Sequence, residues 1–244
     1  MTDRATVAVL RALEVRSHLG DRLHIEVDPA RVEGWIWSEL PRKKRARNGR
    51  LAPLLPAHVR GLWFKELTRR HPFVVRARDF PDVVPLTEYT ISRWVTDLVR
   101  VHRDDPTSSL WYRDLCAAIE RDGSVASHGG VRTSDAEVEE FLTGYMLPLV
   151  DSLERHGFDR AIAGEVGWAA IGPSGEVIKT KRATHRFFIA RALGLPSVPL
   201  EVAIVHADWW RSVFPASRRP GLATPGWENR LTDALRGVAE AHRR

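Results

Sequence analysis

The sequence of 244 residues predicts a mixed α/β protein of the α+β type, with a small mixed sheet, flanking helices and a mainly helical N-terminal region before them. Apolar residues recur at helical spacing through the first half of the chain. From residue 166 onward the pattern changes to short apolar runs separated by turn residues, which is typical of strands. Contents of 43% hydrophobic and 28% charged residues indicate a folded globular chain.

The first half is expected to hold one strand and several helices. Residues 22–27, RLHIEV, alternate between apolar and polar side chains as a strand does, and Asp28-Pro29 ends the alternation. A short helix through Trp35 and Trp37 is expected next. Apolar residues at helical spacing then predict helices over residues 56–70 and 89–101, and a third helix from Thr107 or Ser108 as N-cap to Gly123 as C-cap.

The middle of the chain contains a polar, glycine-rich stretch. Residues 123–132, GSVASHGGVR, have little to bury and predict a boundary or a mobile loop. Ser134 and Glu137 then have the spacing of a capping box, which predicts the start of a helix. We expect Gly144 and Pro148 to divide that helix, because proline lacks a backbone donor and clashes with the preceding turn.

The second half alternates strands, turns and helices. Strands are predicted over 166–171, 176–178 and 200–205, a turn over 172–175, and helices over 185–193 and 227–242. The predicted organisation is a mainly helical region over 1–132, a sheet-containing domain over 133–214, and a linker with a C-terminal helix over 215–244.

No stretch approaches the roughly 18 consecutive apolar residues of a membrane-spanning helix. The N-terminal segment carries Arg11 and Glu14 within its apolar part, where the core of a signal peptide would exclude them. We therefore expect a cytoplasmic protein without a membrane partner.

Cysteine and histidine usage argues against metal and disulfide chemistry. The single cysteine, Cys116, excludes an internal disulfide and a zinc site built on cysteine pairs, and we expect it to be a core residue. The ten histidines show no pair at metal-ligand spacing, so no metal site is predicted.

Positive charge is concentrated ahead of the predicted helix at 185–193. The net charge is +6 and the pI about 10.0, which favours a partner that carries phosphate or carboxylate groups. Residues 179–186, KTKRATHR, bring four Lys and Arg residues and a histidine to the helix start. Cations there are unfavourable by roughly 0.3 to 1 kcal/mol each, so an anion is expected nearby. It is either a ligand phosphate or an internal carboxylate such as Glu165 or Asp208.

The same region resembles the ParB and sulfiredoxin superfamily. The resemblance covers roughly residues 137–210 and rests on the order of ATHR at 183–186, LG at 193–194, VP at 198–199 and VHADW at 205–209. It implies a small mixed sheet and a function drawn from nucleotide binding, phosphoryl transfer or chromosome partition. The chain departs from the kinase-like members, since Arg182-Ala183 replaces their Asp-Gly, and the sulfiredoxin cysteine is missing.

The resulting hypothesis is a protein that binds a nucleotide or another phosphorylated small molecule. Its narrower form is a phosphotransferase that uses ATP or another nucleotide together with magnesium. Its expected phosphate-binding residues are Lys179, Lys181, Arg182, Thr184 as helix N-cap, and Arg186. The candidate acid or base residues are His185 and Glu140. Trp209 and Trp168 are expected to wall the pocket.

Two alternatives stay open from the sequence. A DNA-binding, partition-like protein would use residues 41–50, PRKKRARNGR, together with the KTKR cluster on the phosphate backbone. A catalytically inactive binding scaffold is the other, since the Asp-Gly step is lost.

Overall fold

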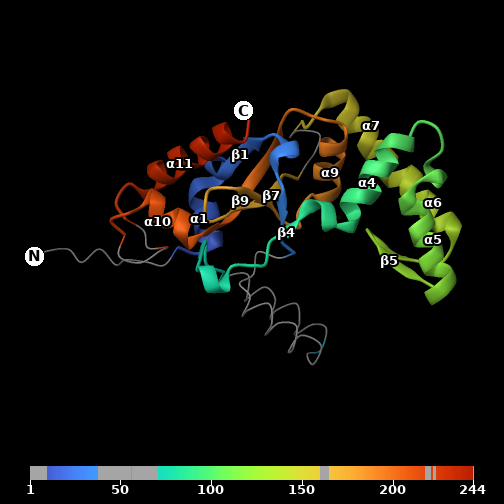
Figure 1. Cartoon of the computed structure of the whole chain (residues 1–244), viewed down its shortest axis with the longest axis horizontal. Helices are drawn as coiled ribbons and strands as arrows, with labels where there is room; N and C mark the ends of the chain where they lie inside the picture. Colours follow the sequence, from blue (N-terminus) through green and yellow to red (C-terminus); the bar gives the residue numbers. More distant parts are fainter. Residues whose placement is uncertain are drawn as a thin grey trace, which may run out of the picture.

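A mixed sheet of seven strands forms the centre of the molecule (Figure 1). The computed structural model describes residues 10–37, 56, 71–159, 165–217, 221 and 224–243. The strands of the sheet are β1 (His24–Val27), β2 (Gly34–Trp35), β3 (Val74–Val75), β4 (Val84–Pro85), β7 (Gly167–Ile171), β8 (Val177–Lys179) and β9 (Val198–His206). The predicted α+β class is confirmed.

Strand β9 is the longest strand and organises the sheet. It pairs antiparallel with β1 and parallel with β3 and β7. Beyond β7 the order continues through β8, β2 and β4, with β7–β8 and β2–β4 antiparallel and β2–β8 parallel. Strand β8 lies between β2 and β7, and its last residue, Lys179, pairs with Trp35 and Ala169. The residues after Lys179 therefore leave the sheet beside both neighbouring strands.

The helices pack as two groups on either side of the sheet's long strands (Figure 1). Their bounds are α1 (Ala12–Leu19), α4 (Thr90–Val101), α5 (Leu110–Asp122), α6 (Asp135–Phe141), α7 (Leu147–His156), α9 (Thr184–Ala192), α10 (Ala207–Val213) and α11 (Trp227–Ala241). Helices α1, α10 and α11 lie against β1 and β9. Helices α4 and α7 pack on α9, and α5 and α6 extend this second group.

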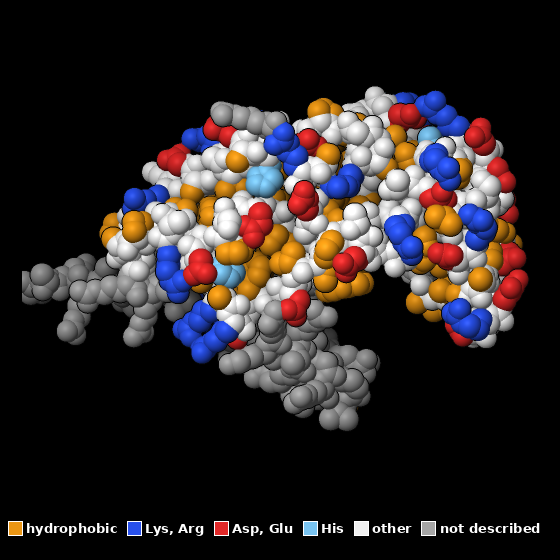
Figure 2. Space-filling view, in the orientation of Figure 1, with side chains coloured by type: hydrophobic (Ala, Val, Ile, Leu, Met, Phe, Trp, Pro, Cys, Tyr) orange, Lys and Arg blue, Asp and Glu red, His pale blue; other side chains and the backbone are white. Residues whose placement is uncertain are grey.

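The core is continuous across most of the molecule. Buried side chains of the sheet, of α4 to α7, of α9 and of α11 form one cluster, and a smaller one collects Ile36, Val75, Phe80, Ala170, Ile178 and Ile204. Figure 2 shows hydrophobic side chains gathered over the sheet on the visible face, while cations and anions are intermingled over the helices. Among the described residues, no helix is both long and apolar enough to cross a membrane.

Several predicted elements are confirmed with small shifts at their ends. Strands are found at 24–27, 167–171, 177–179 and 198–206, and helices at 90–101, 110–122, 184–192 and 227–241. Ser134 caps α6 by accepting from the amide of Glu137, and Gly123 is the C-cap of α5 as predicted. The N-cap of α5 is Ser109, which accepts from the amide of Tyr112, and not Thr107 or Ser108 as predicted. The helix predicted over 56–70 and the basic loop at 41–50 lie outside the described residues, apart from Pro56.

Three expectations are corrected. Trp35 lies in strand β2, where it pairs with Lys179 of β8, and not in a helix. The glycine-rich stretch is an ordered hairpin of β5 (Val125–Ser127) and β6 (Gly130–Arg132). Gly144 and Pro148 do not divide the helix they occur in, because a π turn over Leu142–Met146 joins α6 to α7 and Pro148 lies in the first turn of α7.

The predicted boundary at residue 132 does not separate the sheet from the N-terminal region. Strands β1 to β4, all before this residue, belong to the same sheet as β7 to β9. Short strands of two residues carry little periodicity, so the sequence pattern shows only the helices between them.

Candidate anion-binding site

Helix α9 begins at a strained turn. Ala183 precedes it with φ 50° and ψ 42°, and it is the one residue other than glycine with positive φ in the described part of the chain. Such backbone costs about 1 kcal/mol or more and persists only where the surroundings hold it. Thr184 is the first residue of α9 and not its N-cap, which is Ala183, and the hydroxyl of Thr184 donates to the carbonyl of Lys181 at 2.5 Å. The N-cap alanine has no polar side chain, and no capping bond forms among the described residues, so the first-turn amides face the space ahead of the helix.

Lys179 holds this turn together. Its side chain is fully buried, and Nζ donates to the carbonyls of Thr180 and Arg182, both at 2.5 Å, and of Trp168 at 3.5 Å. The ammonium also lies over the rings of Trp35, at 5.7 Å, and Phe187, at 5.5 Å. Lys179 is therefore not available to a ligand, which corrects the prediction that it binds phosphate.

Gly167 of β7 packs closely against Leu200 and lies beside this buried lysine. A Cβ on Gly167 would stand 2.9 Å from Cδ2 of Leu200 and 3.4 Å from Cε of Lys179. The first distance is too short for two carbon atoms, so a side chain at this position would require Leu200 to shift, whereas the distance to Lys179 is close to ordinary van der Waals contact.

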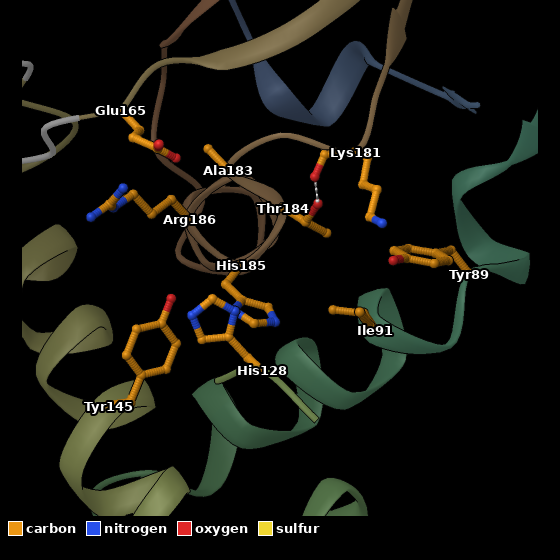
Figure 3. A pocket seen from close by; sticks show the side chains of 10 residues that line it. All are labelled: Tyr89, Ile91, His128, Tyr145, Glu165, Lys181, Ala183, Thr184, His185 and Arg186. Carbon is orange, nitrogen blue, oxygen red and sulfur yellow. Dashed lines mark hydrogen bonds between the residues drawn. The ribbon is translucent and has the colours of Figure 1, made fainter. Parts of the chain in front are cut away.

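A cavity of about 310 Å³ opens at the start of α9 (Figure 3). Its lining comes from the turn and α9, from the start of α4, from the β5–β6 hairpin, from the π turn and from the loop before β7. The lining residues are Tyr89, Ile91, His128, Tyr145, Glu165, Lys181, Ala183, Thr184, His185 and Arg186. Lys181, Thr184, His185 and Arg186 were predicted site residues, and the structure brings them together.

Lys181 and Arg186 flank the helix start from opposite sides (Figure 3). Lys181 lies on the side of Tyr89, and Arg186 lies beside Glu165 and Tyr145. Within the described residues, neither cation forms an ion pair with a carboxylate. A ligand that contacts both must therefore extend across the first turn of α9.

His185 lies at the floor of the cavity among aromatic rings. Its ring centroid is 5.2 Å from that of His128, 5.5 Å from Trp111 and 5.9 Å from Tyr145. Burial, with a smaller effect from His128, lowers the pKa of His185 to about 4. His185 is therefore neutral near pH 7, which makes it a hydrogen-bonding residue and argues against the predicted role as an acid.

Two tyrosines supply apolar walls. Tyr89 stacks on Trp35 with ring centroids 4.3 Å apart, and burial raises the pKa of Tyr89 to about 12. Tyr145 stacks on His128 at 4.6 Å, and burial is the largest cause of its raised pKa. Both hydroxyls therefore stay protonated and can donate hydrogen bonds.

Arg182 and Trp168 form a separate surface cluster. The guanidinium of Arg182 lies 4.9 Å over the Trp168 ring and 3.4 Å from a carboxylate oxygen of Glu165. Arg16 stacks on the same ring at 4.3 Å, and Trp168 donates to Glu201 at 3.1 Å. These contacts explain why neither Arg182 nor Trp168 lines the cavity, contrary to prediction.

Two more predicted site residues lie elsewhere. Trp209 is 6% exposed on α10 and belongs to the core, so it does not wall the pocket. Glu140 is exposed on α6 and lines a second cavity of about 530 Å³, together with Arg132 and Glu137. The two cavities share His128 and Tyr145. Among the described residues that line the first cavity, the one with a carboxylate is Glu165.

The sequence pattern missed Tyr89, Ile91, His128 and Tyr145. Each lies at least 39 residues before α9, and no motif links these positions. Tyr89 at the start of α4 and His128 in the glycine-rich hairpin can be recognised as cavity residues only once the fold is known.

Comparison with family models, with curated proteins and with solved structures finds no match to this chain. The resemblance to the ParB and sulfiredoxin superfamily therefore stays a prediction.

Proposed function

We propose that this protein binds a nucleotide or another phosphorylated small molecule in the cavity at the start of α9. The observation that supports it most is the pairing of Lys181 and Arg186 with an uncapped helix N-terminus in one concave site. Phosphate oxygens accept hydrogen bonds from arginine in bidentate fashion and from first-turn amides, and the helix dipole favours their charge. An extended anion such as a polyphosphate chain fits two cations on opposite sides of one helical turn.

The walls favour a ligand that also carries a flat ring. Ligand pockets usually measure about 300 to 1,000 Å³ and combine apolar walls with few polar groups, and this cavity lies at the lower end of that range. Tyr89, Tyr145 and Ile91 provide apolar surface at which a nucleobase can pack. A nucleotide therefore fits the lining better than free phosphate does.

Phosphoryl transfer is the narrower form of this proposal. It needs a group to orient the attacking hydroxyl and, in most enzymes, magnesium on the phosphates. Glu165 is the carboxylate suited to that role, in place of Glu140, because it faces the cavity beside Arg186 (Figure 3). A Glu165→Gln protein that keeps nucleotide binding and loses nucleotide turnover would support transfer; unchanged turnover would contradict it.

Thermal unfolding in the presence of candidate ligands tests the binding proposal. The panel is ATP, CTP, GTP, pyrophosphate and a short DNA duplex, each with and without magnesium. A ligand at 100 times its Kd adds about 2.7 kcal/mol to the free energy of unfolding, which raises the Tm by several degrees. We expect one nucleotide to do so.

Substitutions locate the bound ligand. Arg186→Ala and Lys181→Met should each weaken binding about tenfold to a hundredfold, since a charge-assisted hydrogen bond contributes about 1.5 to 3 kcal/mol. Arg236→Ala is the matched control, because Arg236 is exposed on α11 and pairs with Asp233. Equal nucleotide affinity in all three variants would overturn the proposal. Stabilisation by DNA alone, lost at high salt, would favour the DNA-binding alternative.

A further inference from the structure

A buried histidine at the end of α4 has one ring nitrogen without a hydrogen-bond partner. His102 is the C-cap residue of α4, and its side chain is 9% exposed. Its Nδ1 lies 2.5 Å from the carbonyl oxygen of Val99. A carbonyl only accepts, so Nδ1 carries the hydrogen, and Nε2 of the neutral ring presents a lone pair. That Nε2 is buried and makes no hydrogen bond with the described residues.

The unpartnered nitrogen faces two carboxylates of α7. Nε2 is 3.8 Å from Oε2 of Glu154, and one ligand atom each from His102, Asp151 and Glu154 lie within 4.8 Å of one another. Asp151 and Glu154 are three residues apart, which places them on one helix face. A lone pair 3.8 Å from one carboxylate oxygen, with a second carboxylate close by, is repulsive, and a cation among the three groups would turn the repulsion into coordination.

We propose that His102, Asp151 and Glu154 form a binding site for a divalent transition metal ion of the zinc type. An imidazole with carboxylates suits zinc and its neighbours, whereas magnesium and calcium prefer oxygen ligands alone. Two donors about 2.1 Å from a tetrahedral zinc are separated by roughly 3.4 Å, close to the observed gap between Nε2 and Oε2. The hydrogen bond from Nδ1 to a backbone carbonyl orients the ring, as metal-ligating histidines usually require.

Two exposed arginines pair with the same carboxylates and can move away from them into solvent. Arg103 binds the other oxygen of Glu154, Oε1, at 2.5 Å, and Arg155 is 3.8 Å from Asp151. The side chains of Arg103 and Arg155 are 72% and 68% exposed, so both can swing into solvent without disturbing the core. Oε2 of Glu154 stays directed towards His102.

The ion would tie together the two helices that pack on α9. His102 closes α4, while both carboxylates lie on α7. Tyr89 precedes α4 and Tyr145 lies in the π turn before α7, so the same two helices carry two walls of the anion-binding cavity. The proposed role of the ion is therefore structural.

Calorimetric titration of zinc chloride into the full chain tests the site, with magnesium chloride as the comparison. Wild type should bind one zinc ion at this site and gain thermal stability, with magnesium at least about tenfold weaker. His102→Ala and Asp151→Asn should each weaken zinc binding about tenfold or more. His156→Ala is the matched control, because His156 is an exposed histidine at the end of the same helix, and its zinc affinity should equal that of wild type.

Cobalt gives an independent readout of the ligand set. Cobalt(II) bound to the wild type should show visible absorption of a low-coordinate site, and the band should change in Glu154→Gln. The side chain of Glu154 is 35% exposed, so we expect this variant to fold. If His102→Ala unfolds, Asp151→Asn and Glu154→Gln decide the question. Equal zinc affinity in wild type and these variants, or no zinc binding by wild type at millimolar concentration, would overturn the proposal.

Discussion

At the scale of single residues, burial controls the chemistry of His185. Its imidazole is surrounded by the rings of Trp111, His128 and Tyr145, and its pKa of about 4 lies well below the ordinary value of 6.5. The neutral ring offers the cavity one donor and one acceptor without adding charge. Positive charge at the site therefore comes from Lys181, Arg186 and the helix start.

This pKa shift predicts a loss of stability in mild acid. The unfolded chain takes up a proton at His185 below about pH 6.5, whereas the folded chain does so only near pH 4. The contribution of His185 to the free energy of unfolding is therefore present above pH 6.5 and is lost as the pH falls towards 4. Between pH 7 and pH 4 the free energy of unfolding of wild type should fall by about 3 kcal/mol more than that of His185→Leu. Urea unfolding at both pH values measures the difference, and parallel losses in the two proteins would contradict it.

At the scale of elements, the connection between β8 and α9 is the part that shapes the site. The buried ammonium of Lys179 donates to three backbone carbonyls, and Gly167 lies beside its side chain. The turn ends in the left-handed conformation of Ala183, which aims the first turn of α9 into the cavity. Lys179, which the sequence analysis assigned to a ligand, is thus a residue that holds the turn before α9.

Substitution by methionine should lower stability at Lys179 and leave it nearly unchanged at Lys181. Lys179→Met leaves buried carbonyls without their donor, so we expect the free energy of unfolding to fall by about 2 to 4 kcal/mol. Lys181→Met removes an exposed cation and should change stability by less than about 0.5 kcal/mol while weakening ligand binding. Chemical denaturation of both proteins checks the contrast, which equal stabilities would refute.

Element prediction from the sequence succeeded where periodicity is strong. Helices α4, α5 and α11 have long apolar faces with buried residues such as Leu98, Leu115 and Leu231, and their positions follow from that spacing. Strand β2 was not predicted because a strand of two residues shows no alternation of apolar and polar side chains. Its Trp35 is buried by contacts with β8 and with Tyr89. Tertiary contacts, not local preference, make it a strand.

At the scale of the whole molecule, the candidate site joins the start of α9 to elements that lie far before it in the chain. The sequence located the cations around α9, because charge at a helix start is a local pattern. It could not locate Tyr89, His128 and Tyr145, since they reach the cavity only when α4 packs on α9 and the hairpin and the π turn place His128 and Tyr145 against His185. It also placed Trp209 at the site, although the buried position of α10 directs that ring into the core.

Backbone amide NMR during a titration with pyrophosphate tests the central claim most directly. If the anion binds at the start of α9, the amide signals of Thr184, His185 and Arg186 should shift progressively and saturate, because first-turn N–H groups would donate to the phosphate. The same titration of Arg186→Ala should require about tenfold or more pyrophosphate. Unmoved signals at these three residues, with saturable shifts elsewhere in the chain, would contradict the account.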